Sequence, residues 1–181
     1  MFGIDPEQLR REWLEGNNPE MGRRREIILL ATLGAAVLTV GTLRQVGILK
    51  RLPDLGCARC AANQVSTSDA AYSLGAPDAP VAAASYMANA ALAAFGPADR
   101  AETMPLAPIA ATVKAGVDVA GAAAYLREMV RQKNWCVYCL ASAAAGIGVL
   151  ALTIPEALRA IRRLAKGWND GQNAGSNHRS Q

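Results

Sequence analysis

Residues 135–155 read WCVYCLASAAAGIGVLALTIP, and this stretch decides the fold. It carries no charge, and a helix that crosses a bilayer needs roughly 20 such residues. A soluble domain of 181 residues would have difficulty burying so apolar a helix. Residues 27–43 and 79–98 are also free of charge. These three stretches predict membrane-spanning helices, although the alanine-rich 79–98 is equally typical of a buried helix in a soluble protein.

A fourth apolar stretch, 105–126, is interrupted by Lys114 and Asp118. The two residues are four apart and so share one face of a helix, where an ion pair can neutralise both charges. Charged residues inside a membrane are often functional, but we expect a structural pair here. The predicted fold is all-α: a membrane-embedded four-helix bundle with an outside loop between helices one and two.

The formal net charge of +4 does not point to a nucleic-acid partner, because the basic residues gather at the ends of the predicted spans. An arginine run at 23–25 precedes the first span, and four basic residues follow the last one. Such clusters are typical of cytoplasmic flanks. With four spans, both termini are expected in the cytoplasm. The four residues after the last span are Arg159, Arg162, Arg163 and Lys166.

Three segments are expected along the chain. Residues 1–25 form a cytoplasmic N-terminal segment with a short helix at 6–15, in which Asp5 is the N-cap and Pro6 the first helical residue. Residues 26–166 form the four-helix transmembrane domain, with helices two and three at 80–95 and 106–130. No cleavage site follows the first span, which should remain as an anchor. Residues 167–181 are poor in apolar residues and are expected to form a disordered cytoplasmic tail.

All four cysteines occur in two Cys-x-x-Cys pairs, Cys57/Cys60 and Cys136/Cys139. Under the predicted topology both pairs lie on the outer side of the membrane. They can hold a metal, form static structural bridges or exchange electrons. A metal site is not favoured, because thiol pairs in an oxidising compartment form disulfides and the single histidine, His178, lies in the tail. Structural bridges and redox exchange remain open.

Redox exchange fits the position of the second pair. The first thiol of a Cys-x-x-Cys at a helix N-terminus lies near the positive end of the helix dipole, which lowers its pKa. A helix that begins near Trp135 gives Cys136 this place, and Cys139 is expected deeper on nearly the same face. Electrons then pass between the pairs by thiolate attack, and a lipid-soluble quinone is the obvious acceptor in a membrane.

The segment WCVYCLAS at 135–142 resembles the signature that opens the last helix of the vitamin K epoxide reductase family. Bacterial members have Trp-Cys-Pro-Tyr-Cys there, and Val137 takes the place of the proline. After Cys60, the run Val-Ser-Thr-Ser at 65–68 and AAYSLGAPDAPVAAASYMANAALAAFG at 70–96 are similar to the family's loop and second helix. The resemblance covers about residues 27–163.

This resemblance implies a quinone pocket, for ubiquinone or menaquinone, at the outer end of the bundle. Cys139 would react with the quinone, Cys136 would exchange with Cys60, and Cys57 would complete the loop pair. Ser66 matches a family serine near the pocket. The implied partner is a thioredoxin-like periplasmic protein, and the implied location is the bacterial inner (plasma) membrane, as a multi-pass protein with its cysteines on the periplasmic side.

Two further side chains are candidates for quinone binding. Tyr138 lies between the thiols and can donate a hydrogen bond to a quinone carbonyl, and Asn89 in helix two either bridges helices or contacts the ligand. One departure concerns Cys57 and Cys60, which are closer together than the family's loop cysteines. Two functions follow: a quinone-linked membrane thiol–disulfide oxidoreductase, or a non-catalytic subunit packed among other membrane subunits of an energy-transducing complex, which small-residue helices also favour.

Overall fold

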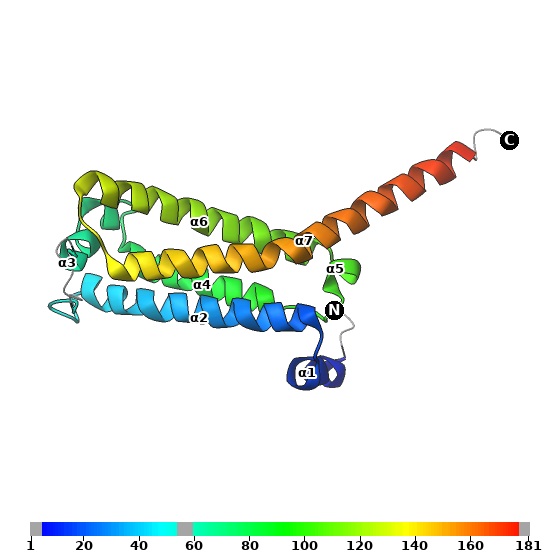
Figure 1. The fold of residues 1–181 in the computed structure, drawn as a ribbon, viewed down its shortest axis with the longest axis horizontal. Coiled ribbons are helices and arrows are strands. Elements are labelled where there is room, and N and C mark those ends of the chain that lie inside the picture. The colour runs from blue at the N-terminus through cyan, green and yellow to red at the C-terminus, as the bar shows by residue number, and fades with distance from the viewer. Residues whose placement is uncertain (1–4, 54–59, 178–181) are drawn as a thin grey trace.

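The computed structural model describes residues 5–53 and 60–177, and within these ranges every element is a helix. The all-α prediction is therefore confirmed for this part of the chain. Four long helices, α2, α4, α6 and α7, lie side by side and run between the same two ends of the molecule (Figure 1). The elements are α1 (Pro6–Glu15), α2 (Pro19–Gln45), α3 (Ala62–Ser66), the 3-10 helix η1 (Asp69–Tyr72), α4 (Asp78–Ala94), α5 (Arg100–Thr103), α6 (Leu106–Gln132) and α7 (Val137–Asn177).

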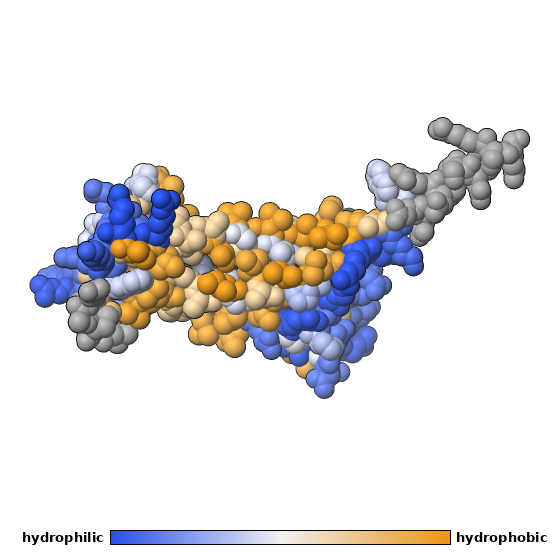
Figure 2. All heavy atoms as spheres, turned by 45° about the horizontal axis from the view of Figure 1, so that its top comes forward, coloured by the Kyte–Doolittle hydropathy of each residue, from blue (hydrophilic) through white to orange (hydrophobic). Residues whose placement is uncertain are grey.

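Three of the described helices, α2, α6 and α7, are long and apolar enough to cross a membrane. On the face drawn in Figure 2, a hydrophobic band separates two hydrophilic ends of the molecule. Large apolar side chains are exposed on all three helices, among them Leu33, Val117 and Ile147. Contiguous apolar surface of this extent marks a site of contact with another apolar phase, which for helices of this length is the bilayer. The chain is a membrane protein.

Of these four helices α4 is the shortest, with 17 residues. It ends at Ala94 because Phe95 is extended and Gly96 has a φ of +84°, a conformation that favours glycine. The helix predicted at 80–95 therefore differs from α4 by two residues at its start and one at its end. The interrupted stretch 105–126 forms, from Leu106 on, part of the 27-residue helix α6. Within it, Lys114 and Asp118 form the expected ion pair with an N–O distance of 2.5 Å.

The starts of α1 and α2 follow the expected local chemistry. The side-chain oxygens of Asp5 and Asn18 each accept a backbone N–H at 3.0 Å, from Glu7 and Glu20. A proline opens both helices, where its fixed φ fits and its missing N–H leaves no hydrogen bond unmade. The helix and the N-cap predicted for residues 5–15 are confirmed.

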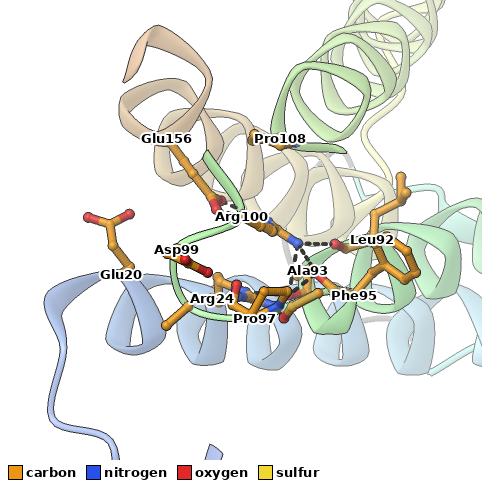
Figure 3. A network of polar contacts seen from close by, with 12 residues as sticks. Glu20, Arg24, Leu92, Ala93, Phe95, Pro97, Asp99, Arg100, Pro108 and Glu156 are labelled. Atoms are coloured by element: carbon orange, nitrogen blue, oxygen red, sulfur yellow. Dashed lines mark hydrogen bonds and ion pairs between the residues drawn. The ribbon is translucent and has the colours of Figure 1, made fainter. Parts of the chain in front are cut away.

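Two buried arginines hold the turn after α4 (Figure 3). Arg24 and Arg100 are each only 1% exposed, so Arg24 is not one of the free flanking charges that the sequence predicted. The carboxylate of Glu156 accepts two hydrogen bonds of 2.7 Å from Arg100. Carbonyl groups at a helix C-terminus carry partial negative charge, which the two guanidinium groups neutralise. Arg24 binds the carbonyl oxygens of Ala93, Phe95, Gly96 and Pro97, and Arg100 those of Leu92, Ala93 and Phe95.

The last helix is longer than predicted. It begins at Val137 and continues to Asn177, and its distal part projects away from the other helices (Figure 1). Residues 167–177, assigned from their composition to a disordered tail, therefore continue the helix. The limits of the three predicted segments stay a prediction.

Candidate functional site

The loop after α2 is tied to the turn before α7. Cys60 forms an isolated parallel β-bridge with Trp135, and the N–H of Ala61 donates to the Trp135 carbonyl at 2.9 Å. These contacts place Cys60 beside Trp135, the residue that precedes Cys136. Cys60 is half-buried and disulfide-bonded, whereas Cys136 and Cys139 are free thiols. Cys57 lies outside the described residues.

Cys136 occupies the N-cap of α7, one residue before the helix begins. Its carbonyl accepts the N–H of Leu140 at 3.0 Å, and its Sγ accepts the N–H of Cys139 at 3.3 Å. The side chain is 1% exposed and belongs to a small core, while Cys139 is partly exposed. Cys136 is thus the less solvent-exposed of the two thiols, and Cys139 lies three residues further along the chain, inside α7. The other buried members of this core are Leu52, Ala62, Val65 and Met129.

The local hydrogen bonds lower the pKa of the Cys136 thiol below its ordinary value. The largest cause is the hydrogen bond from the Cys139 thiol, and the backbone N–H groups of Cys139 and Tyr138 add to it. Burial acts in the opposite direction but is the smaller effect. Of the surroundings of the two free thiols, those of Cys136 include hydrogen bonds that favour its thiolate form.

Both free thiols line a cavity of about 420 Å³ between α2, α4, α6 and α7. Pockets that hold small organic ligands typically have volumes of about 300–1,000 Å³, with apolar walls and a few polar groups. Ser66 and Tyr138, two of the three predicted quinone-binding residues, also line the cavity. The Ser66 hydroxyl donates to the Asn63 carbonyl at 3.2 Å.

Asn89, the third predicted quinone-binding residue, is 3% exposed and is not among the residues that line the cavity. Its Nδ2 donates to Asp118 at 2.6 Å, so the side chain links α4 to α6. Of the two roles expected for Asn89, the structure shows the bridge between helices.

The profile of the vitamin K epoxide reductase family matches residues 26–154. The chain belongs to this family. The matched range contains both cysteine pairs and every residue that lines the cavity. Family membership indicates a membrane protein with thiol oxidoreductase chemistry. No curated protein and no solved structure matches the chain.

One cavity residue of this member of the vitamin K epoxide reductase family was not predicted from the sequence: the carboxylate of Asp78. Asp78 is the first residue of α4 and lines the cavity together with Cys136 and Cys139. Its Oδ1 accepts a hydrogen bond of 2.5 Å from Nε2 of Gln45 on α2. A signal existed, because Asp78 is the only charged residue between Asp69 and Asp99.

Tyr86 is the second residue of the site that sequence reasoning did not place. Its hydroxyl donates to the Ser142 carbonyl at 2.5 Å, which joins α4 to α7 on the cavity wall. The space for its ring comes from two glycines, since a Cβ built on Gly34 or Gly146 would lie 2.5–2.6 Å from Tyr86 atoms. No local sequence pattern predicts the packing of Tyr86 against Gly34 and Gly146, because the two glycines lie on α2 and α7 and Tyr86 lies on α4.

Proposed function

We propose that this chain is a quinone-linked membrane thiol–disulfide oxidoreductase. It passes electrons from a thioredoxin-like partner through Cys57/Cys60 and then Cys136/Cys139 to a quinone. One observation carries the proposal: two free thiols line a mainly apolar cavity of about 420 Å³, directly beside the disulfide-bonded Cys60.

The thiol chemistry follows from the roles of the two pairs. A thiolate of the reduced partner attacks the loop disulfide, and the released Cys60 thiolate then attacks a Cys136–Cys139 disulfide at Cys136. Cys139 leaves as a thiolate. The partner's second thiol then displaces Cys57, and the Cys57 thiolate attacks Cys60 in the mixed disulfide; this restores the loop disulfide and releases Cys136, which gives the reduced pair that the structure contains. When this pair forms its disulfide again, it loses two electrons and two protons.

When a quinone (ubiquinone or menaquinone) is bound, it serves as the electron acceptor. The cavity fits such a ring in volume and in its mainly apolar wall. Ser66 and Tyr138 would hold the ligand at the end where the cysteines lie. The apolar wall keeps water from the thiolates, which limits side reactions.

For the membrane topology we propose four spans, with both termini in the cytoplasm and the cysteines in the periplasm of a bacterial inner membrane. The position of α1 and the distal part of α7 at the same end of the molecule supports an even number of crossings (Figure 1). The 17 residues of α4 extend about 25 Å, somewhat less than the roughly 30 Å of a hydrocarbon core. The paired charges of Arg24 and Arg100 at its C-terminal end then lie near the membrane surface.

The test is quinone reduction by the purified protein with two electron donors, a small dithiol and a reduced thioredoxin-like protein. Cys139→Ala should abolish turnover with both donors. Cys60→Ala is the matched control, because a small dithiol can reduce Cys136–Cys139 directly; this variant should lose activity only with the protein donor. Wild-type turnover by Cys139→Ala contradicts the proposal. An inactive wild-type chain recovered in fixed ratio with other subunits supports the non-catalytic alternative.

A further inference from the structure

Several polar side chains form a hydrogen-bonded cluster between α4 and α6, away from the cysteines. Its centre is the carboxylate of Asp118 on α6, which accepts three hydrogen bonds. Oδ1 accepts from the Ser85 hydroxyl at 2.7 Å, and Oδ2 accepts from Asn89 at 2.6 Å and from Lys114 at 2.5 Å. The Lys114 ammonium also donates to the Ser85 carbonyl. We call these four residues the Asp118 cluster.

The Asp118 cluster opens into the same cavity as the thiols. Ser85 and Asp118 line this cavity together with Cys136 and Cys139. Asp78, at the cysteine end, and Ser85 are seven residues apart on α4, which corresponds to about 10 Å along the helix. The cavity thus has a redox-active end and, about two helical turns away, an end that carries an ion pair.

A purely structural ion pair does not account for this arrangement. Charged groups in a membrane span are costly and are usually retained for function. The side chains of Lys114 and Asp118 keep 24% and 11% of their surface exposed, so they are not sealed among other helices. The cluster also has unused hydrogen-bonding capacity, because the buried Asn89 Oδ1 has no partner in the part of the chain that the structure describes.

We propose that the Asp118 cluster exchanges a proton with the cavity's ligand at the end remote from the cysteines. The inference rests on the proposed function, since it takes the ligand to be a quinone. A quinone has two carbonyl oxygens on opposite sides of its ring, and each gains a proton on reduction. The thiol protons are released at one end of the cavity, so the remote oxygen needs a separate donor.

The proton and electron balance closes without another reductant. Two electrons leave Cys136 and Cys139 as their disulfide forms. Cys136 releases its proton to water when it becomes a thiolate, and the proton of the Cys139 thiol goes to the near oxygen. The remote oxygen receives its proton from Asp118, which takes it from Lys114, and Lys114 regains a proton from water. Asp118 is therefore the catalytic residue in this scheme, Lys114 supplies it with the proton, and Ser85 and Asn89 are positioning residues.

The experiment compares Asp118→Asn, which keeps the side-chain size but cannot carry a proton, with Asp118→Glu, which keeps the carboxyl group. General acid catalysis typically contributes 10²–10⁴-fold, so we expect quinol formation by Asp118→Asn to slow by at least about 100-fold and Asp118→Glu to recover part of the rate. Reduction of the Cys136–Cys139 disulfide by a small dithiol without quinone should not change. Thr112→Ala, which removes a hydroxyl from α6 outside the cavity, is the matched control.

A second readout does not depend on turnover. Infrared difference spectra recorded on adding ubiquinone should show a carboxyl band in wild type and Thr112→Ala that is absent from Asp118→Asn. If Asp118→Asn does not fold, Lys114→Gln decides, because it keeps a hydrogen-bond donor and removes the charge; it should slow quinol formation similarly. Wild-type rates in the folded variants overturn this inference alone. A wild-type protein that reduces no quinone overturns the proposed function, and this inference with it.

Discussion

At the scale of single residues, the sulfur of Cys136 takes the place that a serine or aspartate oxygen holds at most helix N-caps. It accepts the N–H of Cys139 in the first turn of α7. Backbone N–H groups at this position carry partial positive charge, which stabilises an anion. The helix cap and the thiol with the lowered pKa are thus the same atom, and a substitution of Cys136 is expected to affect both helix stability and the rate of the proposed thiol exchange.

The lowered pKa of Cys136 leads to a test with two variants. Above its pKa the thiol is a thiolate, so a lower pKa extends nucleophilic attack to lower pH. Cys139→Ser keeps a hydroxyl donor beside Cys136, whereas Cys139→Ala removes the donor. In Cys139→Ser we expect the pKa of Cys136 to lie below the free-cysteine value of about 8.5. In Cys139→Ala we expect the pKa of Cys136 to be higher than in Cys139→Ser. Thiolate absorbance against pH measures both, and equal values contradict the role of the hydrogen bond.

Sequence could predict part of this site. The three-residue spacing of Cys136 and Cys139 before an apolar run indicated a thiol at a helix start. Asp78 was missed, and the contact that Tyr86 makes was not predicted, because both depend on contacts between distant parts of the chain. The hydroxyl of Tyr86 meets a carbonyl 56 residues away, and neither position shows a local pattern that pairs them.

At the scale of elements, the packing of α2 against α4 and α7 depends on a helical glycine. A Cβ on Gly34 would lie 2.5 Å from the Tyr86 ring, whereas one on Gly22 in the same helix would meet nothing within 4 Å. Gly34→Ala should destabilise the protein by about 1–3 kcal/mol through overpacking. Gly22→Ala is the matched control and should be neutral or more stable by up to about 1 kcal/mol, because alanine favours helix. Thermal midpoints in detergent compare the two.

The ion pair between Arg100 on α5 and Glu156 on α7 predicts that the effects of substituting these two residues on stability are strongly coupled. Arg100→Leu leaves the Glu156 carboxylate buried without its partner. Glu156→Leu leaves the Arg100 guanidinium buried without its carboxylate. Breaking a buried pair from one side costs about 3–5 kcal/mol. The double variant should lose less than the sum of the single losses, and less than Arg100→Leu alone if the buried charge dominates. Additive losses in a double-mutant cycle, measured by unfolding in detergent, contradict this account.

The end of α4 shows what hydropathy does not record. The sequence predicted helix two at 80–95, close to the observed Asp78–Ala94, but it did not predict that Arg24 and Arg100 take up the last carbonyl groups of the helix. Hydropathy records the type of a residue and not its partner. An arginine that is buried against carbonyl oxygens therefore counts as a flanking charge until the structure is known.

At the scale of the whole molecule, the same two arginines bear on the orientation in the membrane. Arg24 belongs to the run that the sequence assigned to the cytoplasmic flank, yet its side chain, like that of Arg100, is buried and bonded to carbonyl oxygens. The proposed orientation rests on the remaining basic residues near α1 and along the distal part of α7. Four long helices that run between two hydrophilic ends return the chain to the end where it began (Figures 1 and 2).

This arrangement makes a prediction for labelling of intact cells. In a background with all native cysteines replaced by serine, single cysteines are placed at three exposed positions, Arg10→Cys, Gln132→Cys and Lys166→Cys. A membrane-impermeant maleimide should label Gln132→Cys in spheroplasts, because it lies at the cysteine end. Arg10→Cys and Lys166→Cys should react only after permeabilisation. Three crossings would place these last two on opposite sides, so labelling of just one of them in intact spheroplasts excludes α4 as a span.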